Sequence, residues 1–129
     1  MSVPAILAGV FYALLLFALG FVFGPIREFL LAPRLGPVVA TLIEAVPMIA
    51  AMAWLAPRLA RGMELPPRSR ARIAMGLVAL LLVLLAEVSL SRLMRGIGPA
   101  AWLAHYATAP GVVGAAILAA FAAMPWLRR

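Results

Sequence analysis

The chain has 129 residues, of which 67% are hydrophobic and 12% are charged. A soluble domain of this length leaves a large fraction of its surface in water, so it cannot hide so much apolar surface. Long uncharged apolar stretches are typical of membrane spans. The composition therefore excludes an ordinary soluble domain and predicts an integral membrane protein.

The charged residues are mostly arginines, with eleven Arg, no Lys, four Glu and no Asp. A net charge of +7 is compatible with a nucleic-acid partner. The arginines, however, lie between apolar segments and not along one polar face, which is typical of membrane topology and of contact with anionic lipid headgroups. We expect the lipid bilayer as partner and no nucleic acid. The absence of Cys excludes disulfides, thiolate metal sites and cysteine catalysis.

Two apolar segments fill the first half of the sequence. Residues 3–24 would measure about 33 Å as a helix, enough to cross a hydrocarbon core of about 30 Å. The Gly24-Pro25 pair predicts the end of this first span. The second span is expected at 37–56, with Pro47 kinking the helix or loosening one of its turns.

A basic loop opens the second half. Residues 57–72 contain five arginines, and Pro66-Pro67 blocks a continuous helix through them. The following segments are a third span at 73–94, a mixed connection at 95–109 with a short amphipathic helix along the interface, and a fourth and shortest span at 110–127.

The arginines predict how the bundle is oriented. With four spans, both termini and the loop at 57–72 share one side of the membrane, and that side carries seven arginines against four on the other. The positive-inside rule makes that side cytoplasmic. We expect an all-α, polytopic four-helix membrane bundle, a single domain over residues 1–129, with both termini cytoplasmic in a bacterial inner membrane. The loop arginines expected to contact lipid headgroups are Arg58, Arg61, Arg68, Arg70 and Arg72.

Small residues recur every four positions in the last span, at Gly111, Ala115, Ala119 and Ala123. In lipid, small residues let helix backbones approach closely. The stripe fits packing inside the bundle, for which a four-span chain always offers a partner. It also fits the interface of a homodimer.

Two carboxylates lie inside predicted spans, Glu44 in the second and Glu87 in the third. A charge in hydrocarbon costs at least about 2.5–3.5 kcal/mol on insertion scales, so such residues usually pair or serve a function. From the rise per residue, Glu44 is expected about 10 Å below the outer edge of the membrane core and Glu87 about 9 Å below it. The two acids are therefore predicted at one depth, in the outer half of the bundle.

Polar neighbours are expected around these acids, one or two helical turns away or at the outer ends of spans. One interpretation is a site for a proton, a cation or an anionic headgroup. The other is a pair of structural ion pairs, Glu44 with Arg27 or Arg34 and Glu87 with Arg92 or Arg95, that only orient the helices. The candidate site comprises Glu44, Glu87, Arg27, Arg92, Thr41, Ser91 and Arg95, with His105 and Tyr106 in the outer connection.

No pattern indicates catalysis. His105 is the single histidine and has no second His, Cys or Asp near it in the sequence, so we expect no metal site. The sequence has no Gly-rich phosphate loop, nucleophile elbow or zinc-protease motif. An enzymatic activity is unsupported, and no cofactor is expected.

Three short segments carry a resemblance: Phe23-Gly24-Pro25-Ile26-Arg27, Pro33-Arg34-Leu35-Gly36 and Glu44-Ala-Val-Pro47-Met48. Together they resemble a pattern in a group of small uncharacterised four-span bacterial inner-membrane proteins. The resemblance covers about half the chain. It implies the four-span topology and brings no activity with it.

These features predict a small transporter or ligand-binding bundle with an acidic and arginine-containing site in its outer half. The alternative is a non-enzymatic accessory or assembly subunit of a larger inner-membrane complex. Small-residue stripes suited to helix docking favour that alternative.

Overall fold

The computed structural model describes residues 3–96 and 98–128, without the side chains of residues 94, 95, 99 and 110. Every regular element in these ranges is helical, which confirms the all-α class. The elements in chain order are α1 (Val3–Ile26), η1 (Arg27–Leu31), α2 (Ala32–Leu35), α3 (Pro37–Gly62), α4 (Arg70–Arg95), α5 (Pro99–His105) and α6 (Ala109–Leu127). The short helix expected in the connection at 95–109 is α5.

The first helix does not end at Gly24-Pro25 as predicted. α1, η1 and α2 follow one another without a break as far as Leu35. Proline removes one amide donor, and a local π-type turn is one way in which a helix absorbs such a loss. In η1 the Ala32 amide donates to the carbonyl of Arg27, five residues back. The helix ends only at Gly36, whose φ of +87° is accessible to glycine without steric cost.

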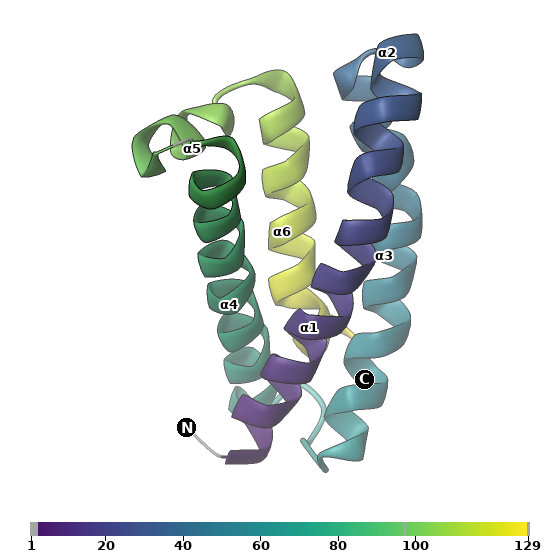
Figure 1. Ribbon diagram of the computed structural model, residues 1–129. Coiled ribbons are helices and arrows are strands. Elements are labelled where there is room, and N and C mark those ends of the chain that lie inside the picture. The colour runs from purple at the N-terminus through teal and green to yellow at the C-terminus, as the bar shows by residue number, and fades with distance from the viewer. Residues whose placement is uncertain (1–2, 97, 129) are drawn as a thin grey trace.

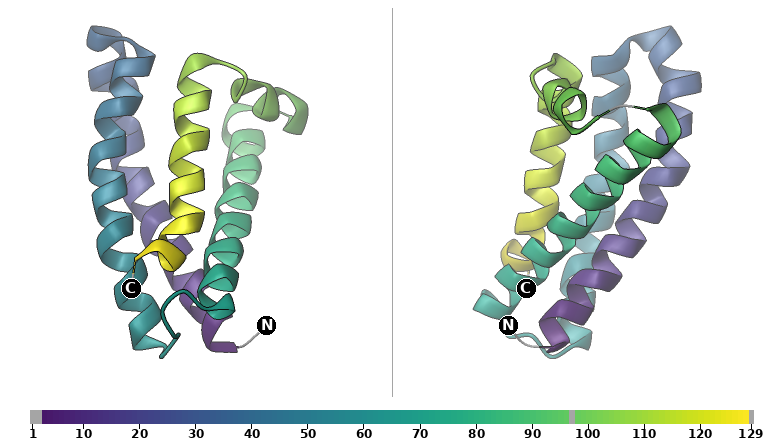
Figure 2. Two further views of the ribbon diagram at one scale, coloured as in Figure 1. Left: turned by 180° about the vertical axis from the view of Figure 1, so that it is seen from behind. Right: turned by 60° about the vertical axis from the view of Figure 1, so that its left-hand side comes forward.

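Four helices surround a common interior in the order α1, α3, α6, α4, since α1 contacts α3 and α4, and α6 contacts the same two helices (Figure 1). Figures 1 and 2 place the N- and C-terminal ends of the chain near the turn between α3 and α4. We call this the loop end. The turn at α2 and the helix α5 lie at the opposite end, which we call the α5 end.

The buried core lies toward the loop end. Its largest apolar side chains are Tyr12, Met52, Met75 and Phe121, each from the half of its helix nearer that end. α1 and α4 touch closely there, because a Cβ on Gly9 would come within 2.8 Å of the Met75 carbonyl oxygen. Toward the α5 end, α1 and α4 diverge (Figure 1).

Pro125 lies inside α6 and leaves the carbonyl of Phe121 without its usual amide donor. The hydroxyl of Tyr12, from α1, donates to this oxygen at 2.8 Å in the buried core. The Tyr12 ring also stacks on Phe121, with ring centroids 4.4 Å apart. The Tyr12 side chain therefore replaces the hydrogen bond that Pro125 removes from α6, and it holds α6 against α1.

The loop predicted at 57–72 is shorter in the structure, because α3 continues to Gly62 and α4 begins at Arg70. Pro57 lies inside α3 and frees the carbonyl of Ala53, which accepts a hydrogen bond from Nε of Arg128 at 3.1 Å. The proline is therefore tolerated in the helix. Pro66-Pro67 lies between the two helices, as predicted.

Arg72 is buried at the loop end, with 1% of its surface exposed. Nε and Nη2 each donate to the carbonyl of Leu65 at 3.2 Å, and Nη1 donates to the carbonyls of Pro125 at 3.3 Å and Arg128 at 2.6 Å. A cation is favoured at the C-terminal end of a helix, where carbonyls lack amide partners. Arg72 thus joins the turn before α4 to the end of α6. It departs from the headgroup contact expected of the loop arginines, because its donors point inward.

The outer surface of the bundle is rich in apolar side chains. Leu77, Leu81 and Leu85 follow one another on α4 at four-residue spacing, and each is more than half exposed. An exposed apolar stripe of this kind is unfavourable in water. By length and composition, the helices able to cross a membrane are Val3–Leu35, Pro37–Gly62 and Arg70–Leu93. The apolar stretch of α6, Gly111–Leu127, is shorter. These helices suggest a membrane protein.

Tyr12→Phe should lower the free energy of unfolding by about 0.5–1.5 kcal/mol, because it leaves the Phe121 carbonyl without a donor. In a Pro125→Ala background, the restored amide can bond to that carbonyl, so the same change should cost less. Unfolding of all four proteins in detergent by a denaturant titration measures both costs. Equal costs in the two backgrounds would show that Tyr12 does not compensate for Pro125.

Arg72→Met should destabilise the fold by about 1.5–3 kcal/mol, since several carbonyls lose a charged donor at once. Arg70→Met is the matched control, because Arg70 lies two residues earlier in the same helical turn and is exposed. The control should change stability by no more than about 0.5 kcal/mol. Thermal unfolding in detergent would compare the two variants, and similar losses would contradict the role given to Arg72.

Candidate functional site

Glu44 on α3 is paired with an arginine from the first helix. Nη1 of Arg27 donates to Oε2 of Glu44 at 2.5 Å. The Glu44 side chain is 10% exposed and that of Arg27 is 31% exposed, so this contact is partly shielded from solvent. Nη2 of Arg27 also lies 3.6 Å from the exposed Glu28. Of the two partners considered for Glu44, the structure brings Arg27 to it, whereas Arg34 is exposed.

The local fold explains why Arg27 reaches α3. Arg27 is the first residue of η1, where the helix widens after Pro25. The helix then reverses at Gly36 and returns as α3, so η1 packs against α3. Thr41 lies one turn before Glu44, but its hydroxyl donates to the Pro37 carbonyl of its own helix at 2.7 Å. Thr41 is therefore satisfied within α3.

Glu87 on α4 has a different kind of partner. The hydroxyl of Tyr106 donates to Oε2 of Glu87 at 3.1 Å. Tyr106 follows α5, and its ring meets the rings of Trp102 and His105 edge-on at centroid distances of 5.2 and 5.7 Å. Burial, followed by the nearby Glu87 carboxylate, raises the pKa of Tyr106. The phenol therefore stays protonated near neutral pH and acts as a neutral donor.

Glu44 and Glu87 are close enough to affect each other electrostatically. Arg27, His105 and Glu44 all lie close enough to Glu87 to alter its electrostatic energy. We call Arg27, Glu44, Glu87 and Tyr106 the polar cluster. The charges of Arg27 and Glu44 cancel, and Tyr106 is neutral. The polar cluster therefore carries the single negative charge of Glu87 when that residue is ionised.

The other predicted neighbours of Glu87 contribute less. Arg92 is exposed and Ser91 is partly exposed, and neither makes a hydrogen bond or ion pair with Glu87 among the described side chains. The side chain of Arg95 lies outside the described residues. The sequence places Tyr106 in the outer connection near the two acids but does not pair it with Glu87, because an aromatic in a connection between spans is more often an interfacial anchor. Its place in the outer connection, near the predicted depth of the acids, is the signal in the sequence.

The loop arginines predicted to contact headgroups fall into three groups. Arg61 and Arg70 are exposed. Arg58 lies over the Trp54 ring at 4.2 Å and Arg68 over Trp126 at 5.3 Å, both within cation–π range. Arg72 is buried, as described above.

The small-residue stripe of α6 does not pack inside the bundle along its length. Ala115 and Ala119 are exposed, whereas Gly111 is buried against the His105 carbonyl. The close approach between α6 and α4 occurs elsewhere, where Gly76 leaves no room for a Cβ beside the backbone of Ala122.

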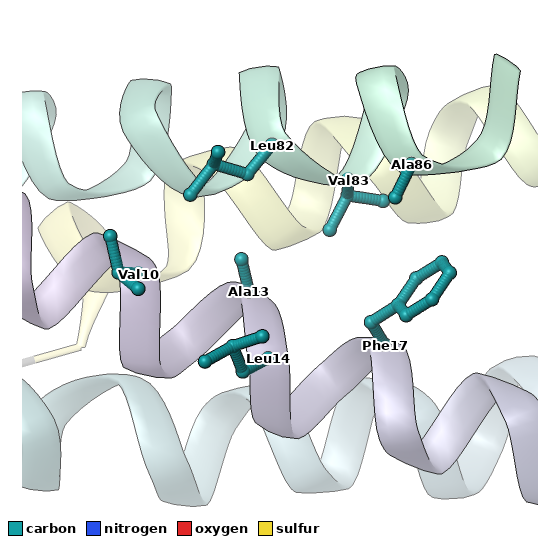
Figure 3. Close-up of a pocket in the computed structure, with 7 residues that line it drawn as sticks. All are labelled: Val10, Ala13, Leu14, Phe17, Leu82, Val83 and Ala86. Atoms are coloured by element: carbon teal, nitrogen blue, oxygen red, sulfur yellow. The ribbon is translucent and has the colours of Figure 1, made fainter. Parts of the chain in front are cut away.

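An apolar cleft lies between α1 and α4 on the loop-end side of Glu87. Its volume is about 260 Å³. In Figure 3 the side chains from the two helices face each other across it. Ala86 and Val83 belong to its wall, and they lie one and four residues before Glu87. Its lining residues are Val10, Ala13, Leu14, Phe17, Leu82, Val83 and Ala86.

The described residues include no group of three or more His, Cys, Asp or Glu side chains placed to hold a metal ion. In comparisons with known proteins, the chain matches no protein-family model, no curated protein and no solved structure.

Arg27→Gln and Glu44→Gln should each destabilise the protein, because each leaves one partly buried charge without its partner. The double variant should lose less than the sum of the two, with an interaction energy of about 0.5–3 kcal/mol. Denaturant unfolding in detergent gives the four values of this cycle. Arg34→Gln serves as the control, since Arg34 is exposed. An interaction energy near zero would mean that the pair does not hold α3 to the first helix.

Proposed function

We propose that the chain is a multi-pass protein of the bacterial inner membrane, with four spans and both termini in the cytoplasm. Three long apolar helices and the exposed leucine stripe of α4 support insertion into lipid. α6 packs against α3 and α4, which supports its role as the fourth span. Both chain ends lie at the loop end together with six of the arginines that the structure describes, and the positive-inside rule favours the cytoplasm for that end.

Within this bundle, we propose a small transporter or ligand-binding protein whose site is the polar cluster. The observation that carries the proposal is the difference between the two acids. Glu44 is held by the fixed charge of Arg27. Glu87, half-buried in α4, is held by the neutral hydroxyl of Tyr106. A carboxyl group with a neutral partner can exchange its proton or bind a cation without breaking an ion pair.

This division gives each acid a separate role. The Arg27–Glu44 pair joins the first helix to α3 and sets the shape of the site. Glu87 is the group that changes its charge when a proton or ligand arrives. Tyr106 lies in the connection before α6. A change in the charge of Glu87 therefore acts directly on the segment that leads into α6.

Infrared difference spectroscopy on the full-length chain in lipid nanodiscs tests this proposal. Titration with pH should reveal a carboxylic acid carbonyl band that is absent in Glu87→Gln and retained in Glu28→Gln, the control at an exposed acid. Tyr106→Phe should keep the band but change its frequency, because it removes the hydrogen bond to the carboxyl group. A pH-dependent band that survives in Glu87→Gln would refute the proposal. Helical circular dichroism and a single elution peak establish that the variants fold.

A further inference from the structure

The close packing of the first helix against α4 does not extend along its whole length. Gly9, Ala13, Gly20 and Gly24 recur on one face of α1 by helical periodicity. Gly9 is in tight contact with α4. A Cβ added at Gly20 or Gly24, in contrast, would meet nothing within 4 Å. The face that packs tightly at the loop end is therefore uncovered toward the α5 end.

On α4, the polar cluster lies directly beyond the apolar cleft. On α4, Val83 lines the cleft, and Glu87 lies one turn later on the same face. On the first helix, Arg27 lies one turn beyond Gly24 on the face that Gly20 shares. We call the cleft together with the open faces of Gly20 and Gly24 the groove.

We propose that the groove admits a hydrophobic organic cation from the bilayer and places its charge beside Glu87. The proposal rests on the function proposed above and names its ligand class. The walls of the cleft are formed by apolar side chains, which suit apolar substituents. When Glu87 is ionised, the polar cluster carries one uncompensated negative charge, because Arg27 is already bound to Glu44. An anionic headgroup would be repelled by the same charge.

Binding exchanges one positive charge for another. The protonated Glu87 carboxyl releases its proton to water as the cation arrives, and the carboxylate then faces the cation, so the net charge of the site is the same before and after. Other groups also act on this carboxylate: Arg27 from η1, Glu44 from α3, and His105 and Tyr106 from the connection between α5 and α6. Affinity should therefore rise with pH over the range in which Glu87 loses its proton.

Two probes of similar size and shape and opposite charge test the sign of the site. Tetraphenylphosphonium should bind the full-length chain saturably in nanodiscs of phosphatidylcholine, as measured by isothermal titration calorimetry, and tetraphenylborate should not. Glu87→Gln should weaken tetraphenylphosphonium binding by at least about tenfold and remove its pH dependence. Equal binding of the two probes, or unchanged binding to Glu87→Gln, would overturn the proposal.

Two substitutions test the route. A Cβ at Gly20 or Gly24 meets no atom within 4 Å, so Gly20→Leu and Gly24→Leu should both fold, extend into the groove and weaken tetraphenylphosphonium binding by at least about tenfold. Ala119→Leu adds a similar side chain on the exposed face of α6 and should leave affinity unchanged. Wild-type affinity in both glycine variants would overturn the proposal that the cation binds in the groove. If the infrared band of Glu87 still titrates in that case, the function proposed above stands without this ligand. If the wild-type chain has no such band, the function itself fails.

Discussion

In an apolar interior, a backbone carbonyl that loses its amide partner must receive another donor, and this requirement governs the bundle. Pro125 and Pro57 each free a carbonyl, and Tyr12 and Arg128 supply the missing hydrogen bonds from other parts of the chain. Arg72 does the same for the end of α6. All of these contacts lie toward the loop end, together with the buried core. These hydrogen bonds and the buried core hold α1, α3, α4 and α6 together at the loop end.

Because the helices are packed closely at the loop end, they can separate only toward the α5 end. α1 and α4 are in tight contact at Gly9, share buried core residues as far as Leu16 and Val83, and diverge toward the α5 end (Figure 1). The ion pair of Arg27 and Glu44 keeps the far end of the first helix on α3, and Tyr106 reaches Glu87 from the other side. The polar cluster therefore joins the first helix to α3, and α4 to the segment before α6, at the α5 end. Chemistry at Glu87 would act on the second of these contacts.

Much of this fold is readable from the sequence, because apolar length alone identifies the long helices and Pro66-Pro67 marks the turn at the loop end. Arg27 was one of two partners considered for Glu44. A local sequence pattern does not predict the structure where a donor far along the chain satisfies a carbonyl that a proline has freed. The continuation of α3 past Pro57 depends on Arg128, 75 residues away from the carbonyl it satisfies, and no local pattern contains that information. Burial of Arg72 was missed for the same reason, since a basic loop residue normally faces water. The rise per residue predicts the depth of Glu87 in the membrane but not the direction of its side chain. The contact between Glu87 and Tyr106 was therefore not predicted.

The contacts of α6 also have a consequence for the order of assembly. α6 follows the other long helices in the chain and has the shortest apolar stretch among them. Tyr12 on α1 and Arg72 on α4 are already present when it emerges, and both hold donors whose acceptors lie in the final residues from Phe121 to Arg128. Arg72 also donates to the carbonyl of Leu65 in the turn before α4, so α6 adds further acceptors to a guanidinium that already has one. Tyr12 gains its acceptor, the carbonyl of Phe121, only when α6 packs against α1. The packing of α6 therefore completes the hydrogen bonds of side chains in two helices that precede it.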